Sequence, residues 1–192
     1  MEYFTEKEFL INNQHFAYKL RKLYVQDFRT FKQLADYLPF FVQTNNVNTL
    51  DIKYSNNYIL NASKETENLV KFGADYLSKI SCPFLLENLK LKSKQLKLRN
   101  DYDELCSYPQ KIKMNNQMNL IYSNKLLLDN NHFFIVSNLM SDFGKLGLTF
   151  NAIFSEITSS QSNWQRFQSL TKQEKKIVKL LVEGCTNVQI SD

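Results

Sequence analysis

The stretch that decides the fold runs from Met118 to Met140. It reads Met-Asn-Leu-Ile-Tyr-Ser-Asn-Lys-Leu-Leu-Leu, then Asp-Asn-Asn, then His-Phe-Phe-Ile-Val-Ser-Asn-Leu-Met. Two apolar runs flank a turn signal, which predicts a β-hairpin over residues 118–128 and 132–140. A second turn signal, Asn115-Asn116, precedes the hairpin, so residues 104–114 are expected to form a third strand. The domain is therefore predicted to end in an antiparallel meander.

Upstream of the meander, the pattern changes between helical and strand-like spacing. Residues 48–54 alternate apolar and polar side chains, which predicts a strand with one buried face, and residues 58–60 are expected to form a short second strand. Apolar spacing, capping residues, Gly and Pro predict the helices. These helices are expected over residues 5–23, 27–37, 63–73, 74–80 and from 83 to about 99.

This order predicts the α+β class, with a five-stranded antiparallel sheet, helices beside it and a helical extension in front. We expect four regions along the chain, each with its own pattern. They are an N-terminal helical extension (1–44), the domain that holds the sheet (45–142), a linker helix (143–169) and the first helices of a helix-turn-helix (170–192).

The composition narrows the class of protein. The chain has 192 residues, of which 43% are hydrophobic and 14% aromatic, enough for a buried core. Three cysteines without CxxC spacing and only two histidines argue against a structural zinc site, so we predict no metal. The N-terminus lacks a signal-peptide pattern and no stretch is apolar enough to span a bilayer, so we expect a cytoplasmic protein without a membrane partner.

The last segment, residues 170–191, predicts the opening of a helix-turn-helix. Thr171 can cap a helix with Glu174 at the capping-box position, Gly184 follows the helix, and Thr186 or Asn187 can cap the next one. The segment resembles the start of the LuxR-type DNA-binding domain. The matching positions are Leu170, Thr171, Glu174, Ile177, Val178, Leu181, Gly184, Thr186, Asn187, Gln189 and Ile190. The departures from the family pattern are Gln173, Lys176 and Ser191.

The resemblance implies DNA as a partner of the full-length protein. The residues that it places near DNA are Thr171, Lys172, Thr186, Asn187 and Gln189. In that family a later helix reads the base edges, so we expect a C-terminally truncated domain whose DNA binding is weak or absent. The alternative is an ordinary surface helical hairpin with the same spacing.

The strand and helix order of residues 47–142 resembles a PAS domain, a five-stranded antiparallel sheet with small helices across one face. Asn57, Gly73 and the Cys82-Pro83 step fall about where PAS sequences carry Asn, Gly and Pro. The resemblance implies a sensory domain for a small molecule or a protein signal. Cys82 is not in a flavin-attachment motif, and no histidine lies between His15 and His132 to hold a haem, so no cofactor is predicted.

Aromatic residues are the candidates for lining a ligand pocket in this sensory domain. They are Tyr54, Tyr58, Phe72, Tyr76, Phe84, Tyr122 and Phe134. The alternative is that these side chains pack the core without a ligand. The identity of any ligand is not readable from the sequence.

The linker is expected to re-enter a helix over residues 147–167 and to carry a homodimer interface, since LuxR-type domains read paired half-sites. The interface candidates are Leu148, Phe150, Ile153, Phe154 and Ile157, which could equally pack on the sheet. No phosphate loop, nucleophile elbow or HExxH motif is present, so we expect no enzyme. The sequence thus predicts a signal-responsive transcriptional regulator. The alternative is a stand-alone sensing or interaction module that does not bind DNA.

Overall fold

The computed structural model describes residues 6–154 together with Thr171 and Gln173. The chain divides into two compact units, residues 1–149 and 150–192, and the fold below is that of the first. Its helices are α1 (Glu6–Gln26), α2 (Phe28–Ala35), α3 (Asn57–Ala62), α4 (Lys64–Ile80), α5 (Pro83–Arg99) and the 3-10 helix η1 (Met140–Phe143). Its strands are β1 (Phe41–Asn46), β2 (Ile52–Ser55), β3 (Cys106–Met114), β4 (Gln117–Asp129) and β5 (His132–Leu139).

The strands form one antiparallel sheet in the order β2-β1-β5-β4-β3. This confirms the α+β class and the five-stranded antiparallel sheet with helices. The predicted meander is confirmed almost to the residue as β3, β4 and β5. Asn115 and Asn116 both adopt positive φ in the β3–β4 turn, at 50° and 62°, as a two-residue hairpin turn requires.

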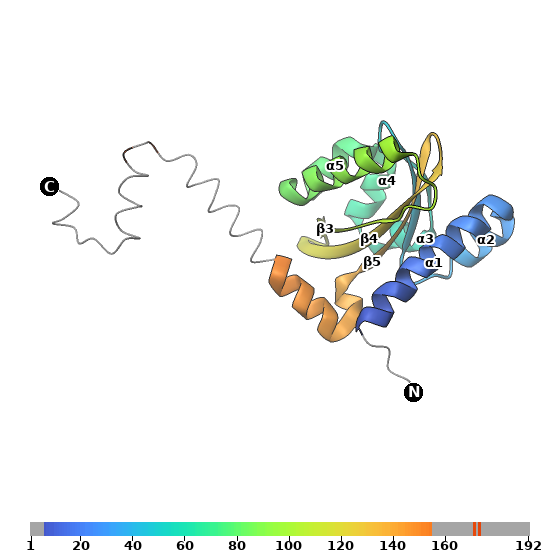
Figure 1. Cartoon of the computed structure of the whole chain (residues 1–192). Helices are drawn as coiled ribbons and strands as arrows, with labels where there is room; N and C mark the ends of the chain where they lie inside the picture. The colour runs from blue at the N-terminus through green and yellow to red at the C-terminus, as the bar shows by residue number, and fades with distance from the viewer. Residues whose placement is uncertain (1–5, 155–170, 172, 174–192) are drawn as a thin grey trace. The chain divides into compact units, whose positions relative to one another are not determined.

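Helices cover both faces of the sheet (Figure 1). On one face α1 and α2 pack Ala17, Leu20 and Phe31 against side chains from β1, β4 and β5 such as Phe134. On the other face α3, α4 and α5 cover Ile112 and several further apolar side chains. Because strand side chains alternate in direction, each of β1, β4 and β5 supplies both cores.

The first two strands differ from the prediction. The strand expected over 48–54 is confirmed only from Ile52 onward, as part of β2. Its first part is wrong, because residues 46–49 turn around the Asn46 side chain, whose Oδ1 accepts the N–H groups of Asn48 (2.8 Å) and Thr49 (3.1 Å). The preceding strand β1 was not expected, since its residues are buried on both faces and show no alternation. The expected strand over 58–60 is also wrong, because those residues lie inside α3.

A bulge in β2 lets this short edge strand serve both layers. Thr44 pairs with Tyr54 and Asn45 pairs with Ile52, so Lys53 is an extra residue in β2. Without the bulge, positions 52 and 54 would face the same side. With it, Tyr54 joins the α1–α2 core and Ile52 joins the core under α3 and α4.

Asn56 connects the helical extension to the sheet. Its side chain is fully buried, and its Nδ2 donates to the carbonyls of Ala35 (2.9 Å) and Phe40 (3.0 Å). Its Oδ1 accepts from the N–H of Val42 at 3.1 Å. Its neighbour Asn57, at which the PAS resemblance expects an asparagine, is exposed, and its N–H donates to Asp36 Oδ1 at 3.2 Å.

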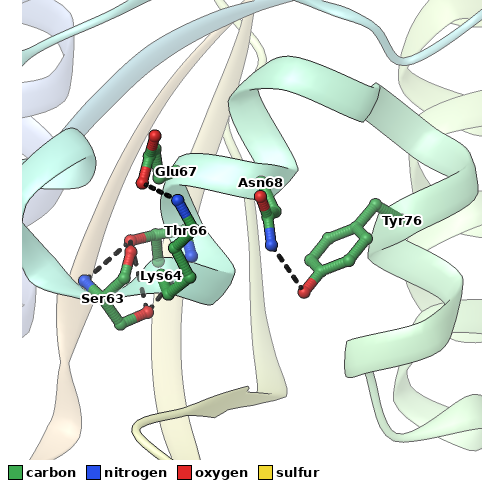
Figure 2. A network of polar contacts seen from close by, with 6 residues as sticks. All are labelled: Ser63, Lys64, Thr66, Glu67, Asn68 and Tyr76. Carbon is green, nitrogen blue, oxygen red and sulfur yellow. Dashed lines mark hydrogen bonds and ion pairs between the residues drawn. The ribbon is translucent and has the colours of Figure 1, made fainter.

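Helix α4 consists of two segments joined at Gly73, where φ is 64° and ψ is −144°. The predicted break at Gly73 is confirmed. The positive φ favours glycine at this position. A Cβ there would lie 2.5 Å from Asp51 Oδ1, the end of a side chain that can rotate away. Asn68 Nδ2 donates to the Tyr76 hydroxyl at 3.3 Å and bridges the two segments (Figure 2).

The start of α4 is closed by a capping box. Ser63 and Thr66 form it reciprocally, and Glu67 pairs with Lys64 at 2.8 Å (Figure 2). After η1, residues 144–154 are helical, so the expected linker helix begins three residues earlier than predicted. The rest of that expected helix lies outside the described residues.

Candidate functional site

A cavity lies between the inner face of the sheet and helices α3, α4 and α5. Its volume is about 50 Å³, which is room for about four water molecules and well below the few hundred Å³ of a drug-sized pocket. Apolar walls come from residues such as Phe41, Leu69 and Ile112. The polar side chains that line it are Gln43, Asn45, Thr66, Tyr108, Gln110, Lys125 and Ser137.

Among the residues that line this cavity, Lys125 is the only charged one. It sits in the middle of β4, paired with Cys106 on β3 and Ile135 on β5, and its side chain is 2% exposed. Strand alternation places it on the same face as Ile121 and Leu127, which are both buried in the cores under the helices. Burial of Lys125 thus follows from its register in a central strand.

The ammonium group of Lys125 is held by one hydroxyl and two rings. Its Nζ donates to Ser93 Oγ on α5 at 2.6 Å. It lies 4.7 Å from the centre of the Phe133 ring and 5.3 Å from that of Tyr108, within the range of cation–π attraction. None of these three groups carries a negative charge, so the ammonium has a hydrogen-bond partner and two ring contacts but no counter-ion.

Removal from water shifts the pKa values of the groups at this site. Desolvation lowers the pKa of Lys125 from 10.5 to about 7, because removal from water disfavours the charged form. Burial also raises the pKa of the Cys106 thiol and that of the Tyr108 phenol. Both neighbours are therefore neutral at pH 7, and the cavity carries a fractional positive charge.

Further polar groups on the same face extend the site across the sheet. Ser123 and Ser137 are hydrogen-bonded to each other, with their oxygens 2.8 Å apart. Asn45 donates from Nδ2 to the Leu50 carbonyl at 3.2 Å, but its buried Oδ1 has no partner. A buried polar atom without a partner is uncommon in a folded protein, and here it lies at a cavity with room for a donor.

The structure does not bring the seven predicted aromatic residues together, and none of them lines this cavity. Tyr54 and Phe134 pack under α1 and α2, on the opposite face of the sheet. Tyr58 and Tyr76 border the core under α3 and α4. Phe72 is 55% exposed, and Phe84 and Tyr122 are half-buried. Alternation shows which residues of one strand share a face, but it does not show which helices cover that face.

A second, larger concavity lies at the surface beside α1. Its volume is about 550 Å³, and Phe16, Phe40, Tyr58 and Phe143 supply most of its apolar lining. Asp142 is the one charged side chain among the residues that line it. This groove is large enough for a ligand or a peptide segment. Asn12, Asn13 and Asn138 add polar groups to its lining, but unlike the Lys125 cavity it has no cationic side chain among its lining residues.

The predicted DNA-binding residues lie almost wholly outside the described part of the chain. Thr171 is exposed and Gln173 is helical, while Lys172, Thr186, Asn187 and Gln189 are outside the described residues.

Of the predicted interface residues, Leu148 and Ile153 are 71% and 48% exposed. The rings of Phe150 and Phe154 stack with their centres 6.0 Å apart. Ile157 lies outside the described residues. The interface stays a prediction.

Comparison with known proteins does not assign the chain to a family. No family model matches the chain, and no curated protein matches it. Among the described residues, no group of three or more His, Cys, Asp or Glu side chains is placed to hold a metal ion. Of the described helices, none has the length and apolar character that a bilayer span needs.

Proposed function

We propose that this chain is the sensory part of a signal-responsive transcriptional regulator. In this proposal a PAS-like domain senses a small signal and controls a LuxR-type DNA-binding domain that begins near residue 170. The order of two strands, a run of helices and a three-stranded meander, on which the PAS resemblance rests, is also the order of the structure. The proposal places the protein in the cytoplasm, with DNA as its partner and a second copy of the chain across residues near Leu148.

One observation supports the sensory role, namely the buried Lys125 without a counter-ion at a cavity that has apolar walls and several polar side chains. A buried ammonium without a counter-ion destabilises the fold, and an apolar side chain of similar volume would pack there at lower free energy. Strongly perturbed pKa values in clefts are more frequent at functional sites than elsewhere. A residue that costs stability in the centre of a domain is best explained by a ligand that it binds.

The test uses the complete protein encoded by the gene. Random duplex DNA is selected for binding, and the affinity for the selected duplex is then compared between wild type and Lys125→Met. We expect a selected sequence to emerge and the affinity to change about fivefold or more, the usual scale of coupling between two sites. The matched control, Lys113→Met on β3, changes an exposed lysine and should leave the affinity as in wild type.

If no duplex is selected, the DNA-binding part of the proposal is wrong. The second candidate function, a stand-alone sensing or protein-interaction module, would then be preferred. The surface groove of about 550 Å³ with its aromatic lining favours that candidate. If DNA is bound but Lys125→Met and Lys113→Met behave alike, the cavity does not control the DNA-binding domain.

A further inference from the structure

The charges around Lys125 indicate which charge a ligand of this cavity should carry. From α5 the side chain that faces the amine is Ser93, from β5 it is Phe133, and from β3 they are Cys106 and Tyr108. The hydroxyl is uncharged and the ring is apolar. The thiol and the phenol stay protonated at neutral pH because burial raises the pKa of each. Every element that packs against Lys125 therefore leaves its charge unmatched.

The volume of the cavity sets the size of the ligand. About 50 Å³ accommodates about three to five heavy atoms, given that one water molecule occupies about 10–15 Å³ on the same measure. The apolar walls and the absence of a second cation among the lining residues restrict the charge to one. A dianion would leave one negative charge buried and unpaired, which is as unfavourable as the lone ammonium.

We propose that the cavity binds a small monovalent anion, such as a short carboxylate, through a charge-assisted hydrogen bond from the Lys125 ammonium. This inference rests on the proposed sensory function and names the ligand class of the same site. Gln43 and Gln110 line the cavity and have amide groups that can donate to a second oxygen. The unpartnered Oδ1 of Asn45 can accept from a water molecule that the anion retains.

A reaction of the amine with an aldehyde is the competing chemistry at such a lysine. It would form an imine with release of water, and a neutral imine would remove the positive charge instead of pairing it. A carbamate formed from carbon dioxide would place a covalent anion there with no ammonium left to balance it. Of the three, anion binding is the one that keeps the ammonium and pairs its charge, and the experiment distinguishes it from imine formation.

The experiment titrates the full chain with sodium formate and sodium acetate at constant ionic strength. Binding is followed through the ¹³Cε resonances of ¹³C-lysine-labelled protein. We expect one lysine resonance to shift and its midpoint of titration to move to higher pH when formate is present. Since the amine has a pKa of about 7, the apparent affinity should fall about 30-fold between about pH 6 and pH 8.5.

Three variants make the result specific. Lys125→Met and Lys125→Gln remove the charge with similar volume, and at least one of them is expected to fold and to show no formate binding. Lys113→Met removes an exposed amine on β3 and should bind formate as wild type does. The proposal is overturned if either Lys125 variant binds formate normally, if no anion shifts the resonance at pH 6, or if glyoxal with borohydride adds mass at Lys125 while formate has no effect.

Failure of this inference is distinguishable from failure of the proposed function. If formate and acetate do not bind but Lys125→Met still alters DNA affinity, the sensory role stands with another ligand. If formate binds and DNA affinity is unchanged, the anion site is real and the regulatory role is wrong.

Discussion

Replacement of Lys125 by methionine should stabilise the protein at neutral and acidic pH. The lysine pKa falls from 10.5 to about 7 on folding, so the folded state binds this proton less tightly than the unfolded state. A tenfold difference in proton affinity is worth about 1.4 kcal/mol. The penalty from this group therefore reaches about 5 kcal/mol below about pH 7.

The sign of the pH dependence follows from the direction of the shift. Between about pH 7 and pH 10.5 the unfolded chain carries the proton and the folded chain does not, so stability rises with pH in this window. Below it the penalty is fully present, and above it the penalty is absent. Methionine also leaves Ser93 without its donor, which costs about 1–3 kcal/mol at every pH.

The assay is urea unfolding of wild type and Lys125→Met at pH 6, 7, 8 and 9, followed by circular dichroism. The difference in unfolding free energy should favour methionine by a few kcal/mol at pH 6 and shrink by about 1.4 kcal/mol per pH unit above about pH 7. The contributions of titratable groups that are present in both proteins cancel in this difference of unfolding free energies. Lys113→Met should show no such slope. A difference that is constant between pH 6 and pH 9 would refute the assignment of a neutralised buried amine.

Three further substitutions test the fold. Asn56→Ala should lower the unfolding free energy by about 3 kcal/mol, since it leaves the buried backbone partners of three hydrogen bonds unsatisfied; a loss below 1 kcal/mol in urea unfolding would contradict this. Gly73→Ala should lower the unfolding free energy by about 2 kcal/mol, because a φ of 64° is unfavourable for alanine, and equal thermal melting points of wild type and variant would count against this backbone strain. Phe72→Ser, at an exposed ring, should change stability by less than about 0.5 kcal/mol, and a larger loss would show that the ring packs against another part of the protein.

The C-terminal half of the fold was predictable and the N-terminal strands were not, for a physical reason. The meander is made of neighbouring strands joined by Asn-rich turns, so its register is encoded locally. Strand β1 pairs with β5, which lies about ninety residues further along the chain, and both of its faces are buried. Such a strand has no alternation to detect. The alternating pattern that predicted a strand over 48–54 begins inside the turn after Asn46, so the predicted strand starts four residues before β2 does.

The candidate site was missed for a related reason. Lys125 follows Ile121 and Ser123 at intervals of two residues, and this spacing alone would put it on the inner face of β4. The sequence pattern favours a surface position for lysine, because buried lysines are rare. Only the packing of α5 on this face, with Ser93 above the amine, decides between the two. The aromatic residues that were predicted to line the pocket lie in different cores, because tertiary contacts and not local spacing decide where each ring packs.

The bulge at Lys53 has a consequence for how the gene can vary. Thr44 and Tyr54 share one layer, while Asn45 and Ile52 share the other. Deletion of the Lys53 codon would remove the bulge and make Ile52 and Tyr54 neighbours, and plain alternation would still send their side chains to opposite layers. Natural variants should therefore differ in length at position 53 and in the turn after Asn46, where Asn48 and Thr49 are exposed, and keep Ile52 and Tyr54 in their own layers.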